Sequence, residues 1–148
     1  MIQTIEGEMR MDKELLNRYK PNVKELDLIA EQIDRLNERL ENVPEVSGKV
    51  TKSSKDFPYI EEHVTVRMKE PREASAIKDK LREKEKRQVE LLREVTEVRE
   101  FIEDLPAGVE RQIMEMVYLE GLNQTKVADA LGYTKGRISQ IISGIVKD

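Results

Sequence analysis

Apolar side chains recur along one segment of this chain with the alternating three- and four-residue spacing of a heptad repeat. This first seam consists of Leu26, Ile29, Ile33, Leu36, Leu40 and Val43. Such spacing keeps an apolar stripe on one face of a helix, directed at a partner helix. Pro21 suits the first helical position and Pro44 cannot continue a helix. We therefore expect a helix that begins near Pro21 and ends before Pro44.

A second, longer seam follows with the same spacing. Its members are Ala74, Ile77, Leu81, Lys84, Gln88, Leu91, Val95, Val98, Ile102 and Leu105. Pro106 and Gly108 end it. Lys84 and Gln88 weaken its middle, although polar seam residues also fix helix register. Two amphipathic helices in succession most simply fold back as an antiparallel hairpin, and pairing between two chains would satisfy the same pattern.

The connection between the two helices, residues 45–72, is too long for a tight turn. Val64, Val66 and Met68 alternate with polar residues in the two-residue period of a strand. A short β-hairpin with residues 46–50 is one reading of this pattern, and a surface loop is the other. Polar and aromatic residues gather at the expected tip: Ser53, Ser54, Phe57, Pro58, Tyr59 and His63. A surface loop is favoured for them over a partner contact.

Composition agrees with extended helices, because 38% of residues are charged and only 4% are aromatic. The chain has no cysteine and a single histidine, which excludes disulfides, zinc fingers and a Cys/His catalytic pair. No motif joins a nucleophile, a base and an orienting group, so we expect no enzyme, cofactor or metal site. No apolar run approaches the roughly 20 residues that cross a bilayer, so we expect a cytoplasmic protein without a membrane partner.

The last forty residues differ from the rest, because they predict three short helices separated by glycines. Residues 109–119 place Val109, Ile113, Met116 and Val117 on one helical face, and Gly121 follows as a C-cap. Asn123 is an N-cap for the next helix, which Gly132 ends with a left-handed turn. Thr134 caps a final helix whose isoleucines share one face: Ile138, Ile141, Ile142 and Ile145.

The spacing within these helices matches a helix-turn-helix. Its two helices cross closely, so the first needs a small residue at the crossing, and the turn needs a residue that accepts positive φ. Ala128 and Gly132 meet these demands. The apolar residues expected around the crossing and the turn are Val127, Leu131, Tyr133, Ile138 and Ile141.

The outward face of the final helix distinguishes a DNA-binding module from a three-helix bundle without a ligand. With the isoleucines directed inward, this face carries Gly136, Gln140, Ser143 and Lys147, flanked by Lys135, Arg137 and Ser139. No acidic residue occurs from Lys135 to Lys147, although the chain has 30 acidic residues and a net charge of -4. A solvated face in such an acidic protein would carry glutamates, so this one favours DNA.

The run YLEGLNQTKVADALGYTKGRISQII resembles region 4 of the sigma-70 superfamily, whose recognition helix reads T-x-x-R-I-x-Q-I. The matching residues here are Thr134, Arg137, Ile138, Gln140 and Ile141. The resemblance covers about 40 residues and implies a helix that enters the major groove of a promoter −35 element. The order of coiled hairpin, loop and region 4 head also resembles small phage and prophage regulators of the RinA and ArpU type.

We thus expect an all-α protein with a helical hairpin or coiled coil in residues 1–105, a connection at 45–72 and a helix-turn-helix domain in residues 106–148. The expected function is sequence-specific regulation of transcription, with double-stranded DNA as partner and, in addition, RNA polymerase and a second copy paired through the coiled coil. Phage DNA packaging of the small-terminase kind, and a sigma-like head that binds protein, remain alternatives.

Residues at the head are assigned roles by their place on the helices. Those expected to contact DNA bases are Lys135, Gly136, Ser139, Gln140 and Ser143. Those expected to contact the DNA backbone are Asn123, Gln124, Thr125, Lys126, Thr134, Arg137 and Lys147.

Overall fold

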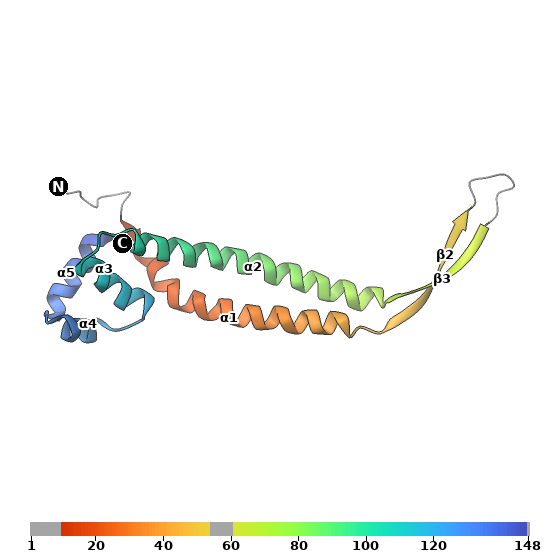
Figure 1. The fold of residues 1–148 in the computed structure, drawn as a ribbon, viewed down its shortest axis with the longest axis horizontal. Coiled ribbons are helices and arrows are strands. Elements are labelled where there is room, and N and C mark those ends of the chain that lie inside the picture. The colour runs from red at the N-terminus through yellow and green to blue at the C-terminus, as the bar shows by residue number, and fades with distance from the viewer. Residues whose placement is uncertain (1–9, 54–60, 148) are drawn as a thin grey trace. The chain divides into compact units, whose positions relative to one another are not determined.

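A computed structural model describes residues 10–53 and 61–147, with side chains described up to residue 48 and again from residue 65. Two long helices dominate, α1 (Lys13–Glu41) and α2 (Pro71–Glu103). Between them lie the strands β2 (Glu45–Ser53) and β3 (Glu61–Lys69). After α2 come α3 (Val109–Met114), the π-helical segment η2 (Glu115–Leu119), α4 (Gln124–Leu131) and α5 (Lys135–Ile145) (Figure 1). The predicted all-α fold with a hairpin-containing connection is confirmed.

The chain divides into two compact units, and each long helix contributes to both. Unit 1 comprises residues up to Leu28 together with those from Gln88 onward. Unit 2 comprises Ile29–Arg87. The ends of α1 and α2 therefore pack with the C-terminal helices of unit 1, while the rest of the two helices joins the strands in unit 2.

Unit 2 is held by the predicted seam. Leu36 and Val43 are buried against Ile77 and Leu81. A heptad repeat returns to the same face of a helix every seven residues, or two turns. The seam residues of α1 and α2 therefore fill the space between the two helices. At the end of this seam the chain crosses into the strands, and the Glu70 N–H donates a hydrogen bond to the Pro44 carbonyl at 2.9 Å.

The strands form the antiparallel ribbon suggested by the alternation of Val64, Val66 and Met68. In its register Val46 pairs with Met68, and Gly48 pairs with Val66. Both valines of this part, Val46 and Val66, are 37% exposed, so the ribbon is not covered on that face. In the predicted tip cluster, Ser54, Phe57, Pro58 and Tyr59 lie outside the described residues, and the side chains of Ser53 and His63 are also outside them.

The predicted start of the first helix at Pro21 is wrong. Helix α1 begins at Lys13, and Pro21 lies inside it on an exposed position. Proline removes one backbone hydrogen bond, so the extra turns need compensation from packing. Leu16 and Tyr19 supply it, because both are buried in the core of unit 1. Strand β1 (Met11–Asp12) directly precedes the helix. It pairs in parallel with β4 (Val146–Lys147).

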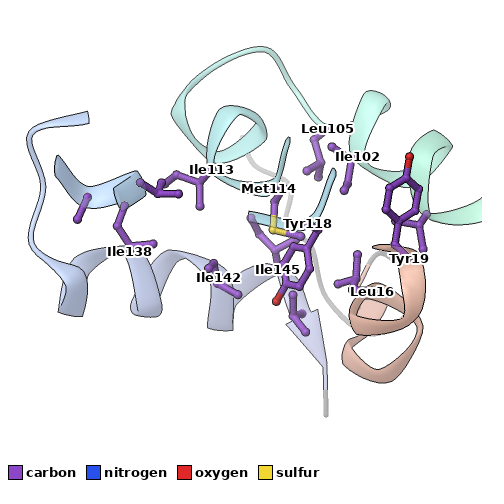
Figure 2. Packing of buried hydrophobic residues seen from close by; sticks show 14 of the residues in the cluster. Leu16, Tyr19, Ile102, Leu105, Ile113, Met114, Tyr118, Ile138, Ile142 and Ile145 are labelled. Carbon is purple, nitrogen blue, oxygen red and sulfur yellow. The ribbon is translucent and has the colours of Figure 1, made fainter. Parts of the chain in front are cut away.

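The core of unit 1 joins six helical segments, α1, α2, α3, η2, α4 and α5. Leu16 and Tyr19 of α1 and Val98 and Ile102 of α2 pack with the side chains of the C-terminal helices, among which Ile113 is 0% exposed. Figure 2 shows the two longest of these side chains from α3 and η2, Met114 and Tyr118, in the middle of the cluster. In this unit the C-terminal helices thus form a third layer, which packs against the buried face of α1 and α2.

Two polar details accompany this core. The Tyr19 hydroxyl accepts a hydrogen bond from the Arg99 guanidinium at 2.8 Å, so the ring is buried while its polar tip is satisfied. Burial raises the pKa of the Tyr118 hydroxyl above its usual value, because the charged form loses solvation there.

Candidate DNA-binding surface

The turn between α4 and α5 has the geometry that its sequence predicts. The Asn123 side chain accepts a hydrogen bond from the Lys126 N–H at 2.9 Å, which caps the start of α4. Gly132 ends that helix with φ of 75°, in the left-handed region that favours glycine. The Tyr133 N–H then donates to the Ala128 carbonyl at 2.9 Å, and Ala128 itself is buried at the crossing. The backbone is therefore fixed through the turn into α5.

Helix α5 begins at a second cap, since the Thr134 hydroxyl accepts a hydrogen bond from the Arg137 N–H at 3.1 Å. Ile138, Ile142 and Ile145 are buried, and Ile141 is half-buried. These residues hold one face of α5 against α3, η2 and α4, as Figure 2 shows for the labelled isoleucines. Because the inward face is fully used, the opposite face is directed away from the core.

All five residues predicted to contact bases lie on exposed positions of α5. They are Lys135, Gly136, Ser139, Gln140 and Ser143. Arg137 and Lys147 are also exposed, and so is Thr134. On the preceding helix, Asn123, Thr125 and Lys126 are exposed and Gln124 is half-buried. The structure thus brings the residues predicted to contact bases together on one helix, with the residues predicted to contact the DNA backbone on α4, α5 and β4 and at their N-caps.

Two apolar residues that the sequence predicts on inward faces, one in the helix-turn-helix and one in the helix before it, are exposed instead. Tyr133, expected inward beside the turn glycine, is 40% exposed. Gly132 turns the chain away from the core at this point, and the side chain of the next residue follows it outward. Val109, expected on the inward face of the scaffold helix, is 38% exposed because it is the first residue of α3.

The sequence analysis did not predict the contact of residues 10–12 with the end of α5 and with β4. The Arg10 guanidinium donates hydrogen bonds to the backbone carbonyls of Ser143 and Val146, the latter at 2.9 Å. Met11 pairs with Val146 and Asp12 pairs with Lys147 in the parallel ladder. Two-residue strands leave no local pattern in the sequence, so no periodicity or turn signal could have revealed this pairing.

The straight first helix expected over residues 109–119 is instead part α-helix and part π-helix. In η2 the Glu120 N–H donates to the Glu115 carbonyl, five residues before it, at 2.9 Å. The Leu122 N–H then donates to the Met116 carbonyl as Gly121 turns the chain with φ of 80°. The wider turn of a π-helix rotates the following side chains, which brings Tyr118 into the core.

A comparison with protein families agrees with this geometry. Residues 107–147 match the family described as Sigma-70, region 4. This segment therefore matches a DNA-binding helix-turn-helix region. The match begins just before α3 and ends within β4, so the region 4 segment contains every helix described after α2. Searches of curated proteins and of solved structures each gave no match.

The matched family, region 4, is a DNA-binding helix-turn-helix rather than a catalytic domain. Among the described residues, no group of three or more histidine, cysteine, aspartate or glutamate residues is placed to hold a metal ion. No helix in the described part of the chain has the length and apolar character needed to cross a membrane.

Proposed function

We propose that this chain is a sequence-specific DNA-binding regulator of transcription, of the kind that phages and prophages encode. The observation that carries the proposal is the exposed face of α5. Lys135 and Arg137 are exposed on this helix, Lys147 is exposed on β4 directly after it, and no acidic residue occurs from Lys135 to Lys147. On a region 4 helix-turn-helix, this is the face that enters the major groove.

Within this proposal, the residues of α5 have different tasks. Gln140 lies in the centre of the exposed face, where a side-chain amide pairs with adenine through two hydrogen bonds. Lys135, Gly136, Ser139 and Ser143 face the neighbouring bases. Arg137 lies on the flank, where its guanidinium meets a phosphate group, together with Thr134 and Lys147. Asn123, Gln124, Thr125 and Lys126 contact the backbone from α4.

The proposal assigns DNA reading to residues 106–148 and assembly to residues 1–105. From Asn123 onward the chain has four basic and two acidic residues, a surplus of two positive charges. Because phosphate contacts supply most of the nonspecific affinity, one head alone binds weakly. Two heads joined through the helical hairpin, or one head supported by RNA polymerase, would raise the effective affinity. The phage assignment rests on the order of hairpin, ribbon and region 4 head.

In-vitro selection of bound DNA followed by two substitutions tests the proposal. Gln140→Ala should relax the preference at one base pair, with a loss of about 1 to 3 kcal/mol of discrimination and little change in salt dependence. Arg137→Ala should weaken binding to all sequences alike and lower the salt slope by about one unit. Affinity is measured on the selected site and on its single-base variants over a salt series.

Two matched variants test whether the loss of any exposed glutamine or arginine would have the same effect on DNA binding. Gln112→Ala removes an exposed glutamine from α3, and Arg82→Ala removes an exposed arginine from unit 2. Both should bind DNA as the wild type does. If no DNA is selected, or if Gln140→Ala binds every sequence as the wild type does, the head binds protein instead. A ring of many subunits in a solution mass measurement would favour DNA packaging.

A further inference from the structure

A surface cavity of about 320 Å³ lies where the start of α1 meets the end of α5. Its lining residues are Arg10, Lys13, Ile142, Ser143, Val146 and Lys147. Three of these six carry a positive charge and none carries a negative one. A cavity lined in this way has the chemistry to hold an anion.

Arg10 is fixed in this cavity by the backbone. Its guanidinium donates to the carbonyls of Ser143 and Val146, which lie at the end of α5 and have no partner within that helix. Its Nε atom is buried without a hydrogen-bond partner among the described residues. A cation also suits the negative end of a helix dipole. Arg10 is therefore a positioning residue that ties the start of α1 to the end of α5.

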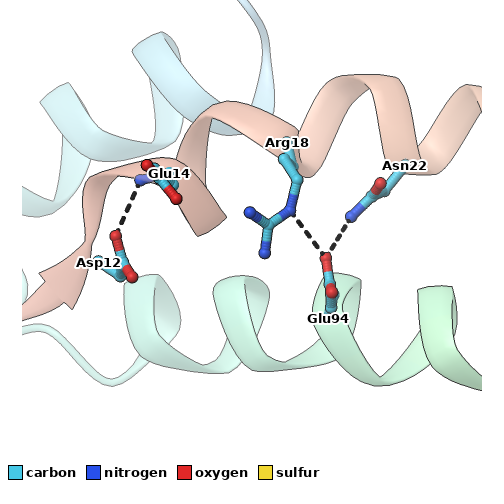
Figure 3. Close-up of polar contacts among 5 residues, drawn as sticks. All are labelled: Asp12, Glu14, Arg18, Asn22 and Glu94. Carbon is cyan, nitrogen blue, oxygen red and sulfur yellow. Dashed lines mark hydrogen bonds and ion pairs between the residues drawn. The ribbon is translucent and has the colours of Figure 1, made fainter.

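Lys13 is the first residue of α1, so its charge lies at the positive end of a 29-residue helix. The Asp12 carboxylate caps that helix, accepting a hydrogen bond from the Glu14 N–H at 3.0 Å (Figure 3). The cavity receives positive potential from Lys13 and from Lys147 on the neighbouring strand β4.

The cavity continues the proposed DNA-binding face. Ser143 and Lys147 line it; Ser143 lies on the exposed face of α5, and Lys147 follows that helix in β4 rather than on the helical face where the sequence placed it. A helix of 11 residues is about 16 Å long at about 1.5 Å per residue, and the major groove is about 12 Å wide. A recognition helix of this length that crosses the groove brings its C-terminal end to the phosphate backbone.

We propose that this cavity binds a phosphate group of the DNA backbone, with Lys13 and Lys147 as its ligands. The inference rests on the proposed function, because it needs α5 to lie in the major groove. It assigns a DNA contact to Lys13, more than a hundred residues before the helix-turn-helix in the sequence. The region 4 match, which begins at residue 107, does not include this residue.

The test measures binding of the full chain to its selected DNA over a salt series. Lys13→Gln should lower the salt slope by about one unit and leave the base preference unchanged. Ethylation of single phosphates should identify one phosphate, at the edge of the site, whose modification weakens the wild type but not Lys13→Gln. Lys147→Gln should lose sensitivity at the same phosphate. Lys24→Gln, an exposed lysine on the same helix outside the cavity, should behave as the wild type does.

Three outcomes would overturn the inference. An unchanged salt slope and footprint in Lys13→Gln, with normal DNA binding by the wild type, would refute this contact and leave the proposed function intact. Calorimetric binding of inorganic phosphate that Lys13→Gln abolishes, without any change in the DNA slope, would identify a free anion as the ligand. Failure of the wild type to bind any DNA would refute both proposals together.

Discussion

The two compact units use the same heptad seam in different ways. In unit 2 the buried cluster consists of Leu36, Val43, Ile77 and Leu81, and each side chain is covered by one partner helix and its neighbours along the row. In unit 1 the cluster has fifteen buried residues drawn from α1, α2 and the C-terminal helices. The comparison shows that a heptad repeat specifies which face of a helix is buried, while the number of layers on that face depends on the rest of the chain.

The largest effect should follow from separating the region 4 head from the long helices. The fragment 106–148 lacks six of the fifteen buried side chains of unit 1: Leu16, Tyr19, Val95, Val98, Ile102 and Leu105. Full burial of one such side chain contributes about 1.5 to 3 kcal/mol, and whole domains are stable by only about 5 to 15 kcal/mol. We expect the fragment to be largely unfolded, as measured by circular dichroism on heating, and therefore to bind DNA far more weakly.

A deletion in unit 2 provides the control. Glu45 and Lys69 are paired neighbours at the base of the ribbon, so a short glycine and serine linker between them could replace residues 46–68. The variant keeps the fifteen-residue cluster, and its unfolding midpoint for unit 1 should be close to that of the full chain. A fragment 106–148 that unfolds cooperatively at the midpoint of the full chain would show that the head has an independent core.

The next effect compares one buried residue from each unit. Ile113→Ala and Leu36→Ala each remove several methyl or methylene groups, with expected losses of about 2 to 5 kcal/mol in the free energy of unfolding. Ile113 is 0% exposed and enclosed by several elements, so its loss should lie near the upper end. Leu36 is 6% exposed in a single row, where neighbours and water more readily fill the space, so its loss should lie near the lower end.

Urea unfolding followed by circular dichroism measures both changes. Equal losses of unfolding free energy, or a larger loss at Leu36, would contradict the idea that the third layer makes the core of unit 1 less tolerant of a truncated side chain. Leu36→Asp sharpens the comparison, because it places an unpaired charge in the seam and should lower the thermal midpoint strongly. An unchanged midpoint in Leu36→Asp would refute the antiparallel pairing of the two helices in unit 2.

Much of this fold follows from local sequence signals, because those signals have local physical causes. Every seam residue is buried or half-buried, including the polar Lys84 and Gln88. The caps at Asn123 and Thr134 and the left-handed turn at Gly132 are likewise confirmed. These features depend on spacing or on one residue and its immediate neighbours. Tertiary packing overrides such signals at Pro21, where burial of Leu16 and Tyr19 extends the helix by two turns toward its N-terminus.

The candidate site divides in the same way. The exposed face of α5 could be predicted because the four isoleucines define the inward direction and a helix turns by a constant angle. Arg10 could not be predicted, since it contacts residues more than 130 positions later through hydrogen bonds to their backbone. Backbone acceptors carry no side-chain identity, so nothing near Ser143 or Val146 indicates that an arginine is needed there.

The smallest expected effect concerns a polar layer in unit 1, where the helices α1 and α2 meet. One Glu94 carboxylate oxygen accepts hydrogen bonds from the Asn22 amide at 2.9 Å and from the Arg18 guanidinium at 3.2 Å (Figure 3). Asn22 is only 6% exposed, whereas the Arg18 side chain is 49% exposed. Water can therefore replace the hydrogen bond of the exposed Arg18 side chain more easily than that of the buried Asn22 amide.

Two substitutions separate the two bonds. Arg18→Ala removes an exposed ion pair and should lower the free energy of unfolding by about 0.2 to 1 kcal/mol, with a smaller effect at high salt. Glu94→Ala also leaves the buried Asn22 amide without this acceptor, and should lower it by about 1 to 3 kcal/mol at every salt concentration. Urea unfolding at low and high salt distinguishes them. Equal losses in the two variants would mean that Asn22 reaches water or another acceptor, and that the boundary between α1 and α2 in this unit is less closed than its buried neighbours indicate.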